Sequence, residues 1–250
     1  MARLIALRFV NWLRTDRLLI FYRFRFTFMK TAPVDIRQAV AGDTSFLIES
    51  IIAAEKSGTD KLSYCTLFGI SEVELRLLLI EILAEDIAGQ ELCISGFLIA
   101  EIEGQPAGAV CSWIEGSGGK PSGILKGNLL FHFFGHARIV AAAENLKLAE
   151  DLSLARMGGA LQIESVFVPA QFRGRGICRQ LIAAHQDEAR RRCPQPMKAQ
   201  IQLVKSNDNA FRAYEKLGFS IVAERQSQNQ RIMELLPSAS KILMEHDLIF

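Results

Sequence analysis

A glycine-rich turn between an apolar run and a helical pattern carries the clearest chemical signal in this sequence. The apolar run, residues 163–168, ends at Pro169, and residues 171–176 then read QFRGRG. Apolar residues recur on one side of the helical pattern that follows: Ile177, Leu181, Ile182 and Ala189. Glycines let the backbone approach a ligand closely, and the first amides of a helix have no intrahelical acceptor. These amides also lie at the positive end of the helix dipole, so the turn predicts a phosphate or pyrophosphate site.

Two other phosphate-binding loops do not fit this segment. The Walker pattern requires Gly-Lys-Ser/Thr at its end, and the Rossmann pattern requires a third glycine where this chain has Arg179.

A second pattern follows in residues 198–219, KAQIQLVKSNDNAFRAYEKLGF. Residues 199–204 predict a strand, and a short helix begins near Asn207 or Asp208, whose side chains suit a helix N-cap. Leu217 closes this helix, and Gly218 stands where a left-handed C-cap belongs.

Together the two patterns resemble the two hallmark motifs of the GNAT acyl-CoA N-acyltransferases. The first is Gln171-x-x-Gly174-x-Gly176 after a strand, and the second is Asn207-x-x-Ala210-x-x-x-Tyr214-x-x-x-Gly218-Phe219. The resemblance implies an α/β fold of the GNAT type, an α+β arrangement with a mixed sheet. It also implies acetyl-CoA as cosubstrate.

The resemblance assigns roles residue by residue. By this resemblance, the pyrophosphate is bound by Arg173, Gly174, Arg175, Gly176, Ile177 and Cys178. The pantetheine arm pairs with the backbone of Val166 and Val168, Asn207 supports the CoA arm, and Phe211 packs on it. Tyr214 is the acid that protonates the departing thiolate.

Two positions depart from the family pattern. Cys178 stands where many members have glycine, although its backbone amide can still donate. Gln202 stands where some peptide-acetylating members carry a glutamate, and an amide cannot act as a base. A ribosomal-protein type of acceptor is therefore not supported.

The expected reaction is N-acetylation of a primary amine, by direct attack on the thioester in a ternary complex and without a metal. A backbone amide near Val166 or Val168 would stabilise the oxyanion. Glu164 is the nearest acidic side chain on that strand and the candidate base, the alternative being a structural hydrogen bonder. Two other functions stay open: a CoA-binding regulatory module without turnover, and a protein bound to a membrane surface.

Composition limits the partners. Half of the 250 residues are hydrophobic and 22% are charged, which is ordinary for a globular protein. The formal net charge is +2, but residues 1–28 hold six arginines against one aspartate, so the remainder is mildly acidic. That balance argues against nucleic-acid binding.

The cysteine and histidine spacings also exclude some functions. The five cysteines form no CxxC pair, which argues against a disulfide framework or a cysteine zinc site and favours a reducing, cytoplasmic setting. His132 and His136 are four apart, but no third ligand is spaced to complete a metal site.

Domain organisation follows from the motifs. Residues 1–30 are expected to be a basic extension outside the fold, and residues 31–250 the catalytic domain, in a monomer or homodimer. No run in the extension reaches the ~18 apolar residues of a membrane span, and a start of translation at Met29 is preferred to a basic interfacial helix. A membrane partner is therefore not expected.

The remaining patterns place the other elements. Strands are expected at residues 34–40, 97–102, 107–114, 220–223 and 242–248, with a turn at 103–105. A helix capped by Asp43 and a helix that begins after Ser71 and ends at Gly89 should come early in the chain. By the resemblance, these helices and their connecting loop wall the acceptor site, which makes candidates of four residues there: Glu55, Lys56, Asp60 and Tyr64.

Residues 115–159 form an insertion before the motif strand. It is expected to begin with a flexible glycine-rich lead and to continue as a helix over residues 137–156. We expect it near the acceptor mouth, the alternative being a cover over one sheet edge.

Overall fold

A computed structural model of the chain describes residues 32–193 and 197–248, which belong to a compact unit that begins at Ala32. Within it, a seven-stranded sheet has the order β1-β2-β3-β4-β5-β7-β6. Its strands are β1 (Asp35–Gln38), β2 (Phe97–Ile102), β3 (Gln105–Ile114), β4 (Leu161–Phe167), β5 (Met197–Val204), β6 (Ser220–Gln226) and β7 (Ser240–Leu248). All neighbouring strands are antiparallel except β4 and β5, so the expected mixed sheet is confirmed.

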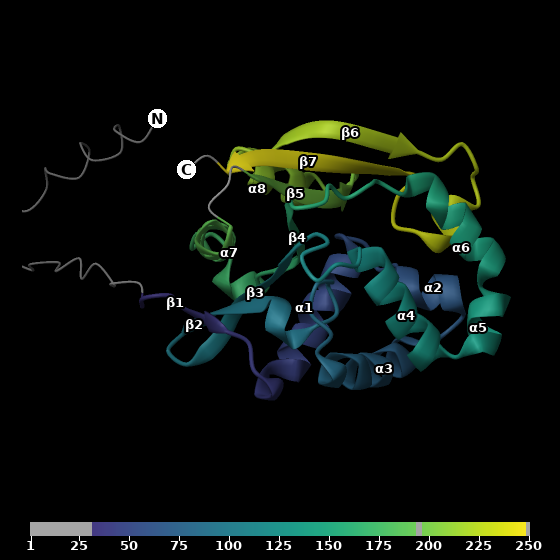
Figure 1. Ribbon diagram of the computed structural model, residues 1–250, viewed down its shortest axis with the longest axis horizontal. Coiled ribbons are helices and arrows are strands. Elements are labelled where there is room, and N and C mark those ends of the chain that lie inside the picture. Colours follow the sequence, from purple (N-terminus) through teal and green to yellow (C-terminus); the bar gives the residue numbers. More distant parts are fainter. Residues whose placement is uncertain (1–31, 194–196, 249–250) are drawn as a thin grey trace, which may run out of the picture. The chain divides into compact units, whose positions relative to one another are not determined.

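Helices cover both faces of the sheet. The longer ones are α1 (Thr44–Lys56), α3 (Glu72–Glu85), α4 (Ser122–Phe134) and α7 (Ile177–Arg192). Shorter ones are α2 (Ser63–Phe68), α5 (His136–Ala141), α6 (Ala143–Ala149), α8 (Asp208–Glu215) and α9 (Ile232–Leu235). Their arrangement around the strands is drawn in Figure 1.

The alternation of side chains along β2 explains why two helical layers are needed. Phe97 and Ile99 are buried in a core with α1, α2, α3 and α4. Leu98 and Ala100 are buried in a second core with α7 and α8. Because successive side chains of a strand point to opposite faces, a strand that is apolar throughout must be covered on both sides.

Strands β4 and β5 pair over only a short distance. Their parallel ladder joins Leu161 to Ala199 and ends with Ile163 opposite Ile201. Beyond that point β5 continues to pair with β7, and β4 continues on its β3 side alone. Ser165 has a positive φ of 51°, and the register with β3 shifts at this point, which marks a β-bulge. The edge of β4 that faces β5 is therefore unpaired from Glu164 onward within the described sheet.

The insertion between β3 and β4 is helical, as expected, but its helices differ from the prediction. The supposed glycine-rich lead already contains α4, and residues 137–156 form α5, α6, a 3-10 turn and then extended chain instead of one helix. Glu115 fastens the base of the insertion, because its side chain accepts from the Ser122 amide at 2.8 Å and from the Trp113 indole at 2.9 Å. The Gly159 amide in turn donates to the Glu115 carbonyl at 2.9 Å. Helix breaks that depend on such contacts leave little trace in local propensity.

Two predicted helix ends were wrong. Asp43 precedes α1 but does not cap it with its side chain; its carboxylate accepts instead from Arg37, at 2.7 and 2.8 Å, and from the Val40 amide. Helix α3 begins with the predicted Ser71 cap, 3.1 Å from the Glu74 amide, but ends at Asp86 in a left-handed conformation, before Gly89. Aspartate tolerates the left-handed conformation, so the helix ends without requiring Gly89 at its C-terminus.

No helix in the described ranges is both long and apolar enough to cross a membrane. The expectations for residues 1–30 lie outside the described residues.

Candidate active site

The predicted phosphate loop begins α7 in the expected way. Gly174 and Gly176 have positive φ values of 76° and 74°, and Gly176 is the N-cap of the helix. Among the described residues, no backbone carbonyl accepts from the amides of residues 174–179. The turn thus presents a run of free donors at the positive end of a 16-residue helix.

A cavity of about 730 Å³ opens at this turn. Six predicted cofactor residues line it: Val168, Arg173, Gly174, Gly176, Ile177 and Cys178. Its opposite wall comes from α8 and the turn after it, with Asn209, Arg212, Ala213, Lys216 and Leu217. The cavity therefore joins the first sequence motif to the helix of the second. Four basic side chains offer positive charge to an anionic ligand: Arg173, Arg179, Arg212 and Lys216.

The other predicted cofactor residues do not line this cavity. The Arg175 guanidinium stacks over the Phe172 ring at 5.7 Å, and the Asn207 side chain caps α8 by accepting from the Ala210 amide at 3.2 Å. Phe211 packs against the core beneath α7 and α8, together with Val166. In this structure Asn207 and Phe211 position the second motif.

Tyr214 lies in the interior, with 7% of its surface exposed. It packs against Phe219 with ring centroids 6.2 Å apart. Burial raises the pKa of its phenol, and the neighbouring Cys178 thiol and Glu164 carboxylate raise it further. The phenol is therefore protonated at neutral pH. Within residues 32–193 and 197–248, no protein group forms a hydrogen bond with this hydroxyl.

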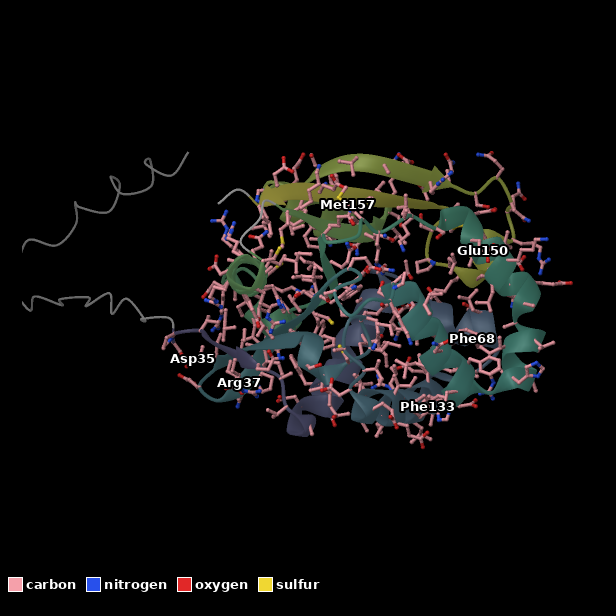
Figure 2. The ribbon with its side chains drawn as sticks, in the orientation of Figure 1. Asp35, Arg37, Phe68, Phe133, Glu150 and Met157 are labelled. Atoms are coloured by element: carbon pink, nitrogen blue, oxygen red, sulfur yellow. The ribbon has the colours of Figure 1, made fainter. Side chains whose placement is uncertain are left out.

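A second cavity, of about 450 Å³, lies on the other side of the bulge in β4. We call it the polar cavity, because charged side chains form part of its lining. Its apolar wall includes Ile51, Leu67, Phe68, Leu130, Leu146, Leu154 and Leu236. Figure 2 labels two of its lining residues, Phe68 from α2 and Glu150 from the turn after α6. Its volume lies within the ~300–1,000 Å³ typical of small-molecule sites.

Several sequence candidates for the acceptor site do line this cavity. Glu55 and Tyr64 reach it, as does Glu164 of the motif strand. Lys56 and Asp60 do not: Lys56 pairs with Glu72 at 3.2 Å, and Asp60 is exposed. Gln202 also lines the cavity, where its amide nitrogen donates to the Leu154 carbonyl at 3.0 Å.

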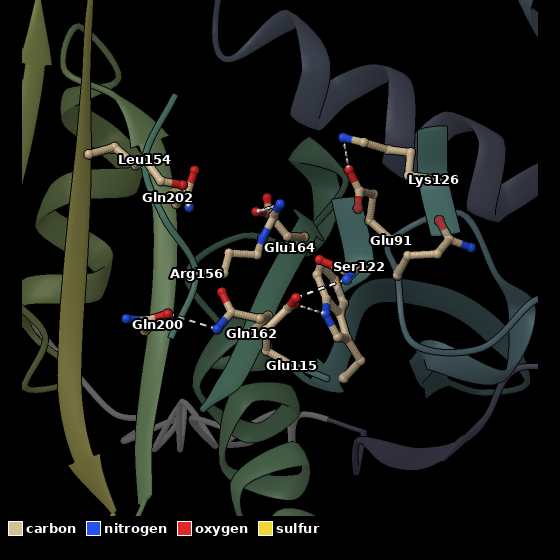
Figure 3. A network of polar contacts seen from close by, with 12 residues as sticks. Glu91, Glu115, Ser122, Lys126, Leu154, Arg156, Gln162, Glu164, Gln200 and Gln202 are labelled. Atoms are coloured by element: carbon tan, nitrogen blue, oxygen red, sulfur yellow. Dashed lines mark hydrogen bonds and ion pairs between the residues drawn. The ribbon is translucent and has the colours of Figure 1, made fainter. Parts of the chain in front are cut away.

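Seven charged side chains line this cavity. Four of them form the two ion pairs that Figure 3 shows. Arg156 Nη2 lies 2.9 Å from Glu164 Oε1, and the Lys126 ammonium forms an ion pair with Glu91. Burial tends to raise the pKa of Glu91, but the Lys126 and Arg156 cations outweigh this effect and lower the pKa to about 2. The guanidinium of Arg156 also lies over the Trp113 ring, 5.3 Å from its centroid.

Sequence reasoning missed four of these residues: Glu91, Lys126, Arg156 and Lys241. None belongs to a motif. Glu91 comes from a loop, Lys126 and Arg156 come from the insertion, and Lys241 comes from the last strand. Only the insertion gave a signal, because a long segment before the motif strand is usually functional.

The bulged end of β4 joins the two cavities. Glu164 and Ser165 line the polar cavity, and Val168 lines the cavity at the phosphate loop. The chain between them has no β5 partner among the described strands. Backbone amides and carbonyls on this edge are thus available to a ligand that extends from one cavity to the other. No three His, Cys, Asp or Glu side chains in the described ranges are grouped so that they could hold a metal ion.

Comparisons with known proteins agree with this geometry. An N-acetyltransferase from Staphylococcus aureus Mu50 superposes with a TM-score of 0.58 at 16% identity, over 85% of this chain and 100% of that one. A second structure, described as an acetyltransferase, superposes with a TM-score of 0.53 at 17% identity, over 86% and 100%. At such identities the likeness concerns the fold alone. No curated protein sequence matches the chain significantly.

The sequence of residues 128–233 matches the family model described as Acetyltransferase (GNAT) domain. This range includes part of the insertion, the motif strand β4, the phosphate loop and the α8 motif with Tyr214. The expected family and fold class are confirmed: residues 128–233 of this chain belong to the acetyltransferase (GNAT) domain family.

Proposed function

We propose that the protein transfers the acetyl group of acetyl-CoA to a primary amine by direct attack within a ternary complex. In this proposal the cavity at the phosphate loop holds CoA and the polar cavity holds the amine. The catalytic domain begins near residue 31, and the insertion of residues 115–159 is part of the acceptor site.

One observation carries the proposal: the unpaired end of β4 leads directly from one cavity to the other. A thioester whose CoA arm lies along this edge would bring its carbonyl to the bulge at Ser165, beside Glu164. The amine could then approach from the polar cavity without a covalent enzyme intermediate. Holding both reactants in one complex can supply much of the rate enhancement.

The CoA side of the site uses backbone groups. The free amides of residues 174–178 donate to the pyrophosphate beside the Arg173 side chain, and the β4 backbone at Val166 and Val168 pairs with the pantetheine arm. A backbone amide of the same segment stabilises the oxyanion as it forms. Asn207 and Phe211 support this side by fixing α8 and its packing.

The chemical step needs one base and one acid. The amine nitrogen bonds to the thioester carbonyl carbon, and Glu164 takes the amine proton directly or through water. When the carbon–sulfur bond breaks, the electron pair leaves with sulfur and the Tyr214 phenol protonates the thiolate. The phenol is protonated at neutral pH, so it carries a proton that it can donate.

A screen of primary amines with acetyl-CoA, monitored by release of free thiol, tests the function. We expect thiol release that depends on the amine and yields an N-acetylated product by mass spectrometry. If the protein binds acetyl-CoA but no amine accelerates thiol release, it is a CoA-binding module without turnover.

A further inference from the structure

The charges that line the polar cavity do not all neutralise one another. Besides the exposed Glu150, the charged lining residues are Glu55, Glu91, Glu164, Lys126, Arg156 and Lys241. Four of them form the two ion pairs Lys126 with Glu91 and Arg156 with Glu164. One carboxylate, Glu55, and one ammonium, Lys241, have no ion-pair partner within the described part of the chain.

These two side chains come from different elements and do not meet. Glu55 belongs to the last turn of α1, and Lys241 is the second residue of β7, opposite Val204 of β5. No ion pair joins them within residues 32–193 and 197–248. Both nevertheless line the same cavity.

Burial disfavours both unpaired charges. It raises the pKa of Glu55 and lowers the pKa of Lys241, the carboxylate of Glu164 offsetting part of the second effect. Both side chains are half-buried, and a charged group partly removed from water without a partner destabilises the fold. Such groups are commonly retained where a ligand supplies the partner.

Building on the proposed function, we propose that the acceptor is an amine that also bears a carboxylate, as a free amino acid does. Lys241 pairs with the carboxylate, and Glu55 faces the ammonium group as the acceptor enters. The apolar wall formed by Leu67, Leu130 and Leu146 then accommodates an apolar side chain. A neutral amine would leave Lys241 unpaired, and a diamine would place a second positive charge beside it.

Pairs of acceptors that differ only in the carboxylate test this proposal on the unmodified protein. Leucine and leucinamide form one pair, and phenylalanine and phenylalaninamide another. The amide has the less basic amine and so more free base at pH 7, which favours the amide if the carboxylate is not recognised. We expect kcat/KM to favour the acid by about 10- to 100-fold, the usual effect of one charge-assisted hydrogen bond.

Substitutions of Lys241 test whether this residue causes the preference for the acid over the amide. We expect Lys241→Met to lower kcat/KM for the acid by about 10- to 100-fold more than for the amide, so that the preference for the acid is lost. Lys241→Arg should retain part of the preference. Lys205→Met is the matched control, because Lys205 lies near the same end of the sheet but is exposed and pairs with Glu224 at 2.8 Å. Acetyl-CoA affinity by calorimetry confirms that each variant is folded.

The outcomes separate this inference from the proposed function. If amides or diamines are acetylated with the same kcat/KM as the acids, the acetyltransferase function stands and the carboxylate proposal is wrong. If the acids are preferred but Lys241→Met keeps that preference, Lys241 is not the recognition residue. If no amine is acetylated at all, the proposed function itself fails.

Discussion

Arg156 Nη2 lies 2.9 Å from Glu164 Oε1, so the insertion holds the acidic side chain of the motif strand. Arg156 comes from the extended chain between the 3-10 turn and β4, and its guanidinium rests on Trp113. Glu164 also lines the polar cavity. In the proposed function the insertion therefore forms one wall of the acceptor site, and the alternative of a mere cover over a sheet edge is not adopted.

Glu164→Gln should lower kcat by about 100- to 10,000-fold with the best acceptor, the range of general base catalysis. Acetyl-CoA affinity should stay unchanged, since the residue lines the other cavity. Steady-state kinetics and calorimetry measure the two quantities, and the exposed Glu81→Gln is the matched control. A Glu164→Gln variant as active as the Glu81→Gln control would assign the proton transfer to another group.

Gly176→Val should weaken acetyl-CoA binding by about 10- to 100-fold, because a side chain at the N-cap blocks the approach of the pyrophosphate to the amides. Valine at a positive φ also strains the backbone, so the control must carry the same strain. Gly116→Val does so, because Gly116 has the same φ of 74° and open space around its Cα. Equal affinities for the two variants, measured by calorimetry, would place the cofactor elsewhere.

Tyr214→Phe should reduce kcat by about 10- to 1,000-fold while leaving acetyl-CoA affinity unchanged. The substitution keeps the ring that packs on Phe219 and removes only the hydroxyl, so stability should change little. Pre-steady-state measurement of thiol release ensures that product release does not mask the chemical step. Normal single-turnover rates would assign Tyr214 to the core and the acid role to another donor.

His185 predicts a pH dependence of stability that is independent of catalysis. Its Nε2 donates to the Val110 carbonyl at 2.8 Å, so its Nδ1 accepts from the Ser112 hydroxyl at 2.7 Å and the ring is neutral. Burial lowers its pKa from 6.5 to about 4. The unfolded chain therefore binds an extra proton between those values, and stability falls as the pH falls below 6.5.

The expected loss between pH 7 and pH 5 is about 2 kcal/mol of unfolding free energy. Urea denaturation at the two pH values measures it. A folded His185→Gln variant should lose most of this pH dependence. An equal slope in that variant would show that other groups titrate in this range.

The sequence identified the parts of the site that depend on backbone conformation. Glycines at 174 and 176, the Asn207 cap and the α7 pattern each act within a few residues, so local spacing reveals them. Six of the ten predicted cofactor residues line one cavity for this reason. Asn207 and Phe211 instead hold the second motif in place, a distinction that requires the packing of α8.

The polar cavity could not be predicted in the same way. Its charged pairs join residues far apart in the chain, such as Glu91 with Lys126, and such contacts leave no periodicity in the sequence. The insertion was predicted as one helix over residues 137–156 because its composition favours helix throughout, whereas tertiary contacts divide it. Lys241 stood just before the strand predicted at residues 242–248, and only the meeting of β7 with α1 and β4 in one cavity makes it unusual.

A single-turnover experiment with acetyl-CoA labelled in the acetyl group tests the central claim most directly. Protein in excess over labelled acetyl-CoA is mixed with the best amine acceptor, or with buffer alone, and the label is followed on the amine and on the protein. We expect the label to appear on the amine only, and to stay on CoA when no acceptor is present. Label bound covalently to the protein would contradict direct attack, and label that stays on CoA in the presence of every amine tested would contradict acetyl transfer itself.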